Sequence, residues 1–372
     1  MKKKSPRLLI SSARNKADMY YLCGASPPED TILLKNGRNI ILLVSEMEFN
    51  RLKRIVRSNV NVIYPAQINL EYRSDFAQWT LKLLKHKEIK TVEVTSDFPI
   101  GIADLLRREK IEVKILTEKG LPRREIKTPD EIIAVQQSQR AAVAAMKAAI
   151  QQIASSEISK DGILMQGKTI LTSEKVRATI CHTLLDHDCV AEETIVAGGS
   201  LSADPHERGS GPLYAGQPIV LDIFPRSGKT GYWGDITRTV CRGPAPVALK
   251  KQYNAVKSAQ AAQLKAVKSG VWGDTIHKIG TDVMEARGFK TGVVDDVPQG
   301  FIHGTGHGVG LEIHEAPRVS SVNHQKLRAG HIITIEPGLY YPTIGGVRIE
   351  DTIVVTKDGY KMLAPCVKRL EV

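Results

Sequence analysis

The chain has 372 residues, of which 42% are hydrophobic and 25% are charged, and these values exclude a mainly disordered or collagen-like protein. No apolar run reaches the ~18 residues of a membrane-spanning helix, and the short apolar stretch near the N-terminus falls below the ~7–15 residues of a signal peptide. At ~100–200 residues per domain, the length predicts two domains. We therefore expect a cytoplasmic protein with no membrane partner.

The formal net charge is +12. The excess of basic residues is spread in short runs through the first third of the chain, which is more typical of a solvated surface than of a nucleic-acid site. The five cysteines are scattered and form no CxxC pair, so neither a disulfide framework nor a thiolate zinc site is indicated. We expect no nucleic-acid partner.

The first third of the chain alternates between strand and helix patterns. Strands are predicted at 7–12, 31–35, 39–44, 60–64, 91–95 and 111–116, and helices at 75–87 and 100–110. Asn36-Gly37, between the second and third strands, is a strong hairpin signal. The pattern predicts an α/β domain over residues 1–125.

The remaining residues, 126–372, read as an α+β domain. Thr128, Pro129 and Glu131 have the spacing of a capping box with proline in the first helical turn, and they begin a long Ala-rich helix over 130–156. Further helices are predicted at 173–185, 246–268 and 273–285. The rest is rich in glycine and β-branched residues, which is typical of strands and turns.

A first pair of acids lies on either side of a turn at Gly228-Lys229. In an unbulged hairpin around this turn, Asp222 would lie directly opposite Asp235. Facing like charges destabilise a sheet, and a bound cation would reverse the sign. The alternative is two exposed aspartates at a sheet edge, but the apolar run before Asp222 favours burial.

A second pair of acids has the same arrangement near the C-terminus. Glu336 follows a strand of apolar residues and Glu350 precedes another, with Pro342 and glycines in the turn between them. Arg348 lies on the same strand face as Glu350. Acids embedded in apolar strands need protons, partners or a metal ion.

Three histidines, His303, His307 and His314, lie between these pairs in a glycine-rich segment. The alternating glycines exclude a helical HxxxH zinc site, and an extended chain would place His303 and His307 on one face. Four carboxylates and an imidazole suit two divalent ions, and this donor set favours Mn²⁺-like or Fe²⁺-like ions. Two such ions activate a bridging water and polarise a carbonyl, which is hydrolytic chemistry.

The segments VLDIFPRSGKTGYWGDITRT, HGTGHGVGLEIHEAP, TIEPGLYY and GGVRIED resemble those of the pita-bread metallopeptidases. This family includes Xaa-Pro aminopeptidases, Xaa-Pro dipeptidases, methionine aminopeptidases and creatinases. The resemblance covers about residues 125–372, and residues 1–125 more loosely resemble the creatinase-type N-terminal domain. It implies a creatinase-type α/β domain followed by an α+β pita-bread catalytic domain.

The resemblance implies a set of metal ligands, namely Asp222, Asp235, His307, Glu336 and Glu350. In this set Asp235 and Glu350 bridge two metal ions, and Glu336 also exchanges protons with the attacking water. Mn²⁺ is expected first, with Co²⁺, Fe²⁺ or Zn²⁺ as alternatives. A homodimer is expected by resemblance only.

The resemblance also implies roles toward the substrate. His206 would contact the substrate near the scissile bond, and His314 would stabilise the tetrahedral intermediate. His303 would line a proline pocket, and Arg348 matches an arginine beside the bridging glutamate. Arg318 matches the position at which some prolidases hold the free carboxylate of the substrate, a task that suits the planar guanidinium.

Two features depart from the family pattern. Asp222 and Asp235 are two residues farther apart than is usual, and Glu207 follows His206 where an aromatic residue is common. Both departures leave the ligand set intact and affect which substrate the pocket would accept. The prediction is a dinuclear metal-dependent peptidase that hydrolyses Xaa-Pro bonds. A creatinase-like hydrolase and a metal-free pseudoenzyme that serves as a binding module are the alternatives.

Overall fold

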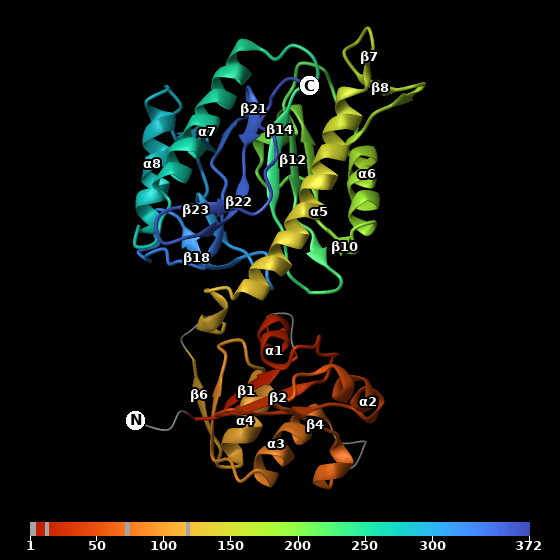
Figure 1. Ribbon diagram of the computed structural model, residues 1–372, viewed down its shortest axis with the longest axis vertical. Helices are drawn as coiled ribbons and strands as arrows, with labels where there is room; N and C mark the ends of the chain where they lie inside the picture. The colour runs from red at the N-terminus through yellow and green to blue at the C-terminus, as the bar shows by residue number, and fades with distance from the viewer. Residues whose placement is uncertain (1–4, 12–14, 71–74, 117–119) are drawn as a thin grey trace. The chain divides into compact units, whose positions relative to one another are not determined.

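The computed structural model describes residues 5–11, 15–70, 75–116 and 120–372 (Figure 1). The chain divides into two compact units, Met1–Arg124 and Glu125–Val372. In the part of the chain that is described, no helix combines the length and apolar character needed to cross a bilayer.

The first unit contains a mixed sheet of six strands in the order β4-β3-β2-β1-β5-β6. The strands are β1 (Arg7–Ile10), β2 (Ile32–Asn36), β3 (Asn39–Leu43), β4 (Val60–Ile63), β5 (Thr91–Val94) and β6 (Glu112–Ile115). β1, β2 and β3 pair antiparallel, whereas β4, β5 and β6 each join the sheet in parallel. The predicted hairpin is present, with Asn36 paired to Asn39.

Helices cover both faces of this sheet because alternate strand residues point to opposite sides. Leu8 packs in one core cluster with residues of α3 (Phe76–His86) and α4 (Ile100–Arg108). Leu9 packs in the other cluster with residues of α1 (Lys16–Cys23) and α2 (Glu46–Ile55). Neither α1 nor α2 was predicted from the sequence. Two short 3₁₀ helices, η1 (Pro65–Ile68) and η2 (Pro122–Arg124), complete the described elements, and Ser12 of the first predicted strand lies outside the described residues.

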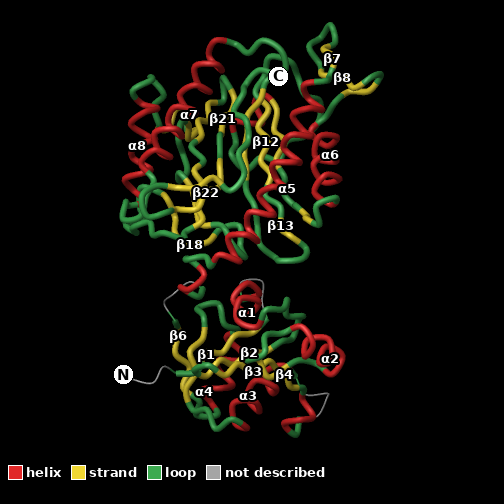
Figure 2. Tube along the Cα trace, in the orientation of Figure 1, coloured by secondary structure: helices red, strands yellow, loops and turns green. Residues whose placement is uncertain are grey.

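The second unit has a layer of strands between two pairs of helices (Figures 1 and 2). α5 (Pro129–Ala154) packs on α6 (Ser173–Leu185), and α7 (Val247–Ala266) packs on α8 (Gly273–Glu285). The predicted capping box is present, since Thr128 Oγ1 accepts from Glu131 N and Glu131 Oε2 accepts from Thr128 N.

Two sheets of the second unit carry the candidate site. The first has the order β11-β12-β14, and the second has the order β18-β17-β19-β22-β23. Their strands are β11 (Ile195–Gly198), β12 (Ile219–Ile223), β14 (Ile236–Val240), β17 (Gly306–Gly308), β18 (Glu315–Val319), β19 (Ile332–Ile335), β22 (Asp351–Val355) and β23 (Tyr360–Met362). The hairpin of β20 (Gly338–Tyr341) and β21 (Gly345–Arg348) lies beside them, as the turn at Pro342 predicted.

Smaller pieces of sheet surround this layer. They are β7 (Glu157–Ile158), β8 (Leu164–Gln166) and β9 (Thr169–Ile170), the pair β10 (Cys189–Val190) and β13 (Arg226–Ser227), and the pair β15 (Gly292–Val294) and β16 (Val297–Gln299), with the 3₁₀ helix η3 (Gly199–Ala203) before the site.

The register of the first predicted hairpin was wrong. Asp222 pairs with Thr237 rather than with Asp235, and Ile223 pairs with Ile236. The reason is that the turn lies one residue farther along the chain. Arg226 pairs with Trp233, and Ser227 N donates to Tyr232 O, so the turn is centred on Lys229-Thr230 rather than on Gly228-Lys229. The two residues of β13 also pair with β10. The two aspartates are therefore brought to one side of the sheet without being directly opposed.

Candidate metal centre

Three side chains of the ligand type converge in the second unit. Asp235 immediately precedes β14, His307 lies in β17, and Glu350 immediately precedes β22. One potential ligand atom from each lies within 4.8 Å of the other two, and all three residues are buried. Segments far apart in the sequence thus supply the two oxygens and one nitrogen of a compact cluster.

Backbone contacts hold these ligand positions. Gln139 of α5 accepts from Asp235 N at 2.7 Å and donates to Asp235 O at 2.8 Å. Glu350 N donates to Thr237 O at 3.1 Å. His307 N donates to Thr334 Oγ1 at 3.1 Å. The cluster is therefore fixed by the surrounding fold rather than by its own side chains.

Asp222 lies beside the cluster and is held by two donors. Arg348 Nη2 lies 2.7 Å from Asp222 Oδ2, and Thr237 Oγ1 lies 2.9 Å from Asp222 Oδ1. The same Thr237 hydroxyl lies 2.8 Å from Glu350 Oε2. Thr237 therefore links the carboxylates of β12 and the start of β22.

Glu336 completes the set of four carboxylates. It follows β19, and its Oε1 lies 3.3 Å from His307 Nε2 and 3.2 Å from Thr334 Oγ1. His307 Nε2 also lies 3.6 Å from Asp235 Oδ2. The ligand residues implied by the sequence thus form one continuous group.

Burial makes this group electrostatically costly. Burial, with the charges of Glu350 and Asp222, raises the pKa of Asp235 well above its usual value. Burial and the charges of Glu336 and Asp222 raise the pKa of Glu350 in the same way. Anionic oxygens forced together in a low-dielectric site favour protons or cations. The oxygen-rich donor set with one imidazole fits a divalent metal ion.

The other predicted histidines lie around this group. His303 Nε2 lies 3.0 Å from the Tyr340 hydroxyl, and the His314 ring packs edge-on against His307 with 4.4 Å between ring centroids. Burial lowers the pKa of His303 to about 4, and partial burial together with the charge of His307 lowers the pKa of His314 to about 4. Both imidazoles are therefore neutral at pH 7. His206 is exposed in the segment after η3, where its backbone N–H donates to Asp204 Oδ1.

The two predicted arginines differ. Arg348 is 4% exposed, and its guanidinium donates to Asp222, to the Tyr340 hydroxyl at 2.6 Å and to Pro205 O at 3.3 Å. Arg318, in β18, is exposed, and in the described ranges no hydrogen bond or ion pair involves its guanidinium. Arg348 thus holds Asp222 and the Tyr340 hydroxyl in place, whereas the Arg318 guanidinium can contact solvent or a ligand.

Sequence reasoning missed several side chains that support the site. Tyr340 and Thr237 were not singled out, although both lie on strands that flank a predicted ligand. Lys127 forms a buried ion pair with Glu315 at 2.9 Å, directly after His314. The lysine precedes the capping box of α5, and its pairing across 188 residues has no local signal in the sequence.

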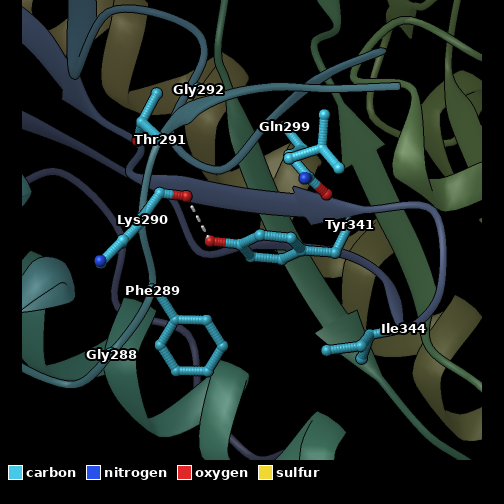
Figure 3. A pocket seen from close by; sticks show the side chains of 9 residues that line it. Gly288, Phe289, Lys290, Thr291, Gly292, Gln299, Tyr341 and Ile344 are labelled. Atoms are coloured by element: carbon cyan, nitrogen blue, oxygen red, sulfur yellow. Dashed lines mark hydrogen bonds between the residues drawn. The ribbon is translucent and has the colours of Figure 1, made fainter. Parts of the chain in front are cut away.

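A separate hollow of about 370 Å³ lies near α8 and β20 (Figure 3). Phe289, Tyr341 and Ile344 line it, and the Tyr341 hydroxyl donates to Lys290 O at 2.8 Å. None of the predicted site residues is among its lining residues. The hollow is therefore distinct from the carboxylate group.

The model of metallopeptidase family M24 matches residues 134–357, a range that contains every predicted metal ligand. The chain belongs to this family. A Xaa-Pro dipeptidase of Pyrococcus horikoshii is 32% identical over 95% of this chain and 92% of its own. The structure of a prolidase from Pyrococcus furiosus covers 98% of this chain and 97% of its own, with a TM-score of 0.81 and 27% identity. That of the prolidase from P. horikoshii OT3 covers 98% and 95%, with a TM-score of 0.82 and 30% identity.

The family membership confirms the predicted fold class and the predicted metallopeptidase activity. The chain is a metallopeptidase with the two-domain pita-bread architecture, and it acts on peptides with the help of divalent metal ions. Its carboxylate group is a possible metal site of the kind that this chemistry needs.

Proposed function

We propose that the enzyme hydrolyses Xaa-Pro peptide bonds and that Asp222, Asp235, His307, Glu336 and Glu350 hold two divalent metal ions, with Mn²⁺ the first candidate. The observation that carries this proposal is the buried excess of carboxylates around Asp235 and Glu350, which the surrounding cations do not neutralise. Two M²⁺ ions would balance four carboxylates in charge. Such ions, when bound, supply an activated water and polarise the scissile carbonyl.

The protein groups in this proposal move protons and orient the substrate. Glu336 accepts a proton from the attacking water and passes it to the leaving prolyl nitrogen. Glu336 is ionised at neutral pH and can accept this proton: although burial acts to raise its pKa, the hydrogen bond from His307 and nearby charges lower it to about 2. His314 is neutral at pH 7 and can donate a hydrogen bond to the tetrahedral intermediate without carrying a charge of its own.

The proline specificity would come from the surroundings of His303. A hollow of about 530 Å³ beside this imidazole is lined in part by apolar residues, including Pro298, Phe301 and Ile302. The His303 ring packs edge-on against Phe301 with 5.4 Å between centroids. A rigid prolyl ring suits such an apolar wall. His206 would contact the substrate near the scissile bond, and Arg348 would act beside the bridging Glu350.

Arg318 would decide the length of the peptide. Its guanidinium has no ionic partner within the described residues, and its charge reaches His314, whose pKa it helps to lower. A free carboxylate on the proline of a dipeptide would gain a charge-assisted contact of roughly 1.5–3 kcal/mol. A tripeptide places an amide there. We therefore infer a preference for dipeptides.

The decisive experiment is a hydrolysis assay on an Xaa-Pro dipeptide after chelation and after re-addition of Mn²⁺, Co²⁺, Fe²⁺ or Zn²⁺, with elemental analysis of the purified protein. We expect about two ions per chain and activity that depends on them. Metal binding without Xaa-Pro hydrolysis would favour a creatinase-like substrate. Absence of both metal binding and Xaa-Pro hydrolysis would favour the metal-free binding module.

A second assay compares Xaa-Pro with Xaa-Pro-Xaa in the wild type and in Arg318→Ala. The dipeptide preference should fall in the variant. Equal or faster cleavage of the tripeptide, unchanged in Arg318→Ala, would favour an aminopeptidase instead. The homodimer and the cytoplasmic location stay predictions, which sedimentation analysis and cell fractionation can test.

A further inference from the structure

The loop at residues 224–235 contains the two additional residues that separate Asp222 from Asp235. It is not an open tip. Ser227 N donates to Tyr232 O at 3.0 Å, Gly231 N donates to Ser227 O at 2.9 Å, and Gly234 N donates to Pro225 O at 2.9 Å. β13 also pairs with β10 outside the hairpin. The loop is thus internally hydrogen-bonded and anchored to the rest of the sheet.

One side of this loop is fixed to helix α5. The Tyr232 hydroxyl donates to Glu131 Oε1 at 2.8 Å, and Ser138 Oγ donates to Tyr232 O at 2.8 Å. A Cβ at Gly234 would lie 2.6 Å from Gln139 N, so only glycine permits this close approach to the helix. The α5 side of the loop therefore offers a rigid base.

The other side of the loop reaches the segment that carries His314. Trp233 N donates to Gly310 O at 2.8 Å, and the indole Nε1–H of Trp233 donates to Leu311 O at 3.1 Å. Between Gly310 and His314 the chain has no regular secondary structure. Two consecutive carbonyls of this irregular segment are therefore held by one residue.

We propose that Trp233 is a positioning residue that sets the place of His314 relative to the metal ligand Asp235. Asp235 follows Trp233 by two residues, so the same end of this rigid loop carries the ligand and contacts the His314 segment. The inference rests on the proposed role of His314 in the reaction.

Trp233→Phe tests the proposal because it removes the indole N–H and keeps an aromatic ring. The segment 309–315 should then exchange its backbone hydrogens about 2- to 10-fold faster, the value of one lost hydrogen bond. This readout needs no enzymatic activity. Trp272→Phe is the matched control, since Trp272 is 43% exposed and its ring contacts Lys326.

The kinetic arm uses the metal-loaded enzyme and an Xaa-Pro dipeptide. If His314 acts on the intermediate, Trp233→Phe should lower kcat by a similar factor while KM and the number of bound Mn²⁺ ions stay unchanged. Trp272→Phe should match the wild type in all three measurements.

The possible results separate the two proposals. Unchanged hydrogen exchange at 309–315 would overturn the positioning role of Trp233. Faster exchange together with unchanged kcat, or with loss of bound Mn²⁺, would also overturn it, since Trp233 would then act on stability or on the metal ligand alone. Faster exchange in a protein whose wild type cleaves no Xaa-Pro bond would contradict the proposed substrate and keep the structural connection to the His314 segment.

Discussion

The carboxylate group around Asp235 and Glu350 lies next to a second buried charged cluster, centred on Arg238. Consecutive residues of an extended chain point to opposite faces, so Thr237 faces the carboxylates and Arg238 faces away from them. In the same way, Glu350 faces the carboxylates and Asp351 faces Arg238. One pair of strands thus carries two buried charged groups on its two faces.

The second cluster is fully paired. Arg238 Nη2 lies 2.7 Å from Asp351 Oδ1, and the guanidinium also donates to the carbonyls of Thr237, Glu350, Cys366 and Val367. Lys368 Nζ lies 2.5 Å from Asp351 Oδ2. Among the residues that the structure describes, Asp235 and Glu350 have no comparable cation. A buried charge that is paired and hydrogen-bonded is structural, whereas a buried excess of one sign indicates that a ligand supplies the missing charge.

The sharpest test of this comparison uses the adjacent residues Glu350 and Asp351. Glu350→Gln should abolish Mn²⁺ binding and reduce hydrolysis by more than the ~10–100-fold typical of an outer-sphere replacement. The metal-free variant should unfold at an equal or higher temperature, because a buried like charge is removed. Calorimetry, elemental analysis and the dipeptide assay measure the three effects.

Asp351→Asn is the matched control and should behave in the opposite way, with lower stability and a retained metal content. If Glu350→Gln keeps near-native metal content and activity, the bridging role of Glu350 is wrong. A metal-free Glu350→Gln protein less stable than Asp351→Asn would contradict the distinction between the two faces.

Arg238→Met should be the most destabilising of the stability variants. It leaves several buried carbonyls without their donor and removes one of the cations that pair with Asp351, which costs about 3–5 kcal/mol in free energy of unfolding. Urea unfolding measures this loss. The double variant Arg238→Met, Asp351→Asn should recover part of it. A loss below about 1 kcal/mol in the single variant would show that the cluster is not a structural pair.

The two buried carboxyls should make the metal-free protein less stable as the pH rises, whereas the lowered pKa values of His303 and His314 act in the opposite direction below about pH 6.5. The pKa values of Asp235 and Glu350 are raised in the folded state by burial and neighbouring carboxylates, so the folded protein binds more protons than the unfolded chain. The favourable contribution of each group is complete below its unfolded pKa near 4. It is lost as the pH rises through the raised pKa, at about 1.4 kcal/mol for each pH unit between the unfolded and folded pKa values.

Melting curves of chelator-treated wild type and Asp235→Asn between pH 4 and pH 8 measure this loss as the difference between the two proteins, because the histidines contribute to both, and saturating Mn²⁺ should remove it. The wild type should lose stability relative to Asp235→Asn as the pH rises. A wild type that gains stability relative to Asp235→Asn over this range would contradict the assignment.

The sequence predicted the helices over 173–185 and 273–285 with the bounds that the structure has, because their apolar spacing and flanking turns agree. It did not predict α2, whose ten residues include five charged ones and bury only Leu52. Such a helix depends on packing against the sheet, which local patterning does not encode.

The candidate site was predicted through its acids and histidines, and its supporting residues were missed. The acids stand out because carboxylates are rare among apolar strand residues. Arg238 and Tyr340 acquire much of their roles from partners more than thirty residues away, such as Asp351 and His303. The register error at Asp222 has a local origin instead, since the turn is centred on Lys229-Thr230 rather than on Gly228-Lys229.

The smallest expected effect concerns Thr237, whose hydroxyl touches both carboxylates and accepts from Arg348 Nε at 3.2 Å. A hydroxyl has a single proton to donate, so it stabilises one of Asp222 and Glu350 at a time and fixes the position of both. Thr237→Val preserves the shape and removes the hydroxyl. We expect Mn²⁺ affinity to fall ~10–100-fold, the range of an outer-sphere partner.

Titration calorimetry with Mn²⁺ measures the effect of Thr237→Val, and Thr237→Ser is the control that restores the hydroxyl and should bind nearly as the wild type does. Stability without metal should change little, because the lost hydrogen bond is offset by removal of a polar group from a site already rich in them. If Thr237→Val bound Mn²⁺ like the wild type, Arg348 and the backbone contacts alone would position Asp222 and Glu350. The Thr237 face and the Arg238 face of β14 would then differ in the charges beside them and not in the role of the hydroxyl.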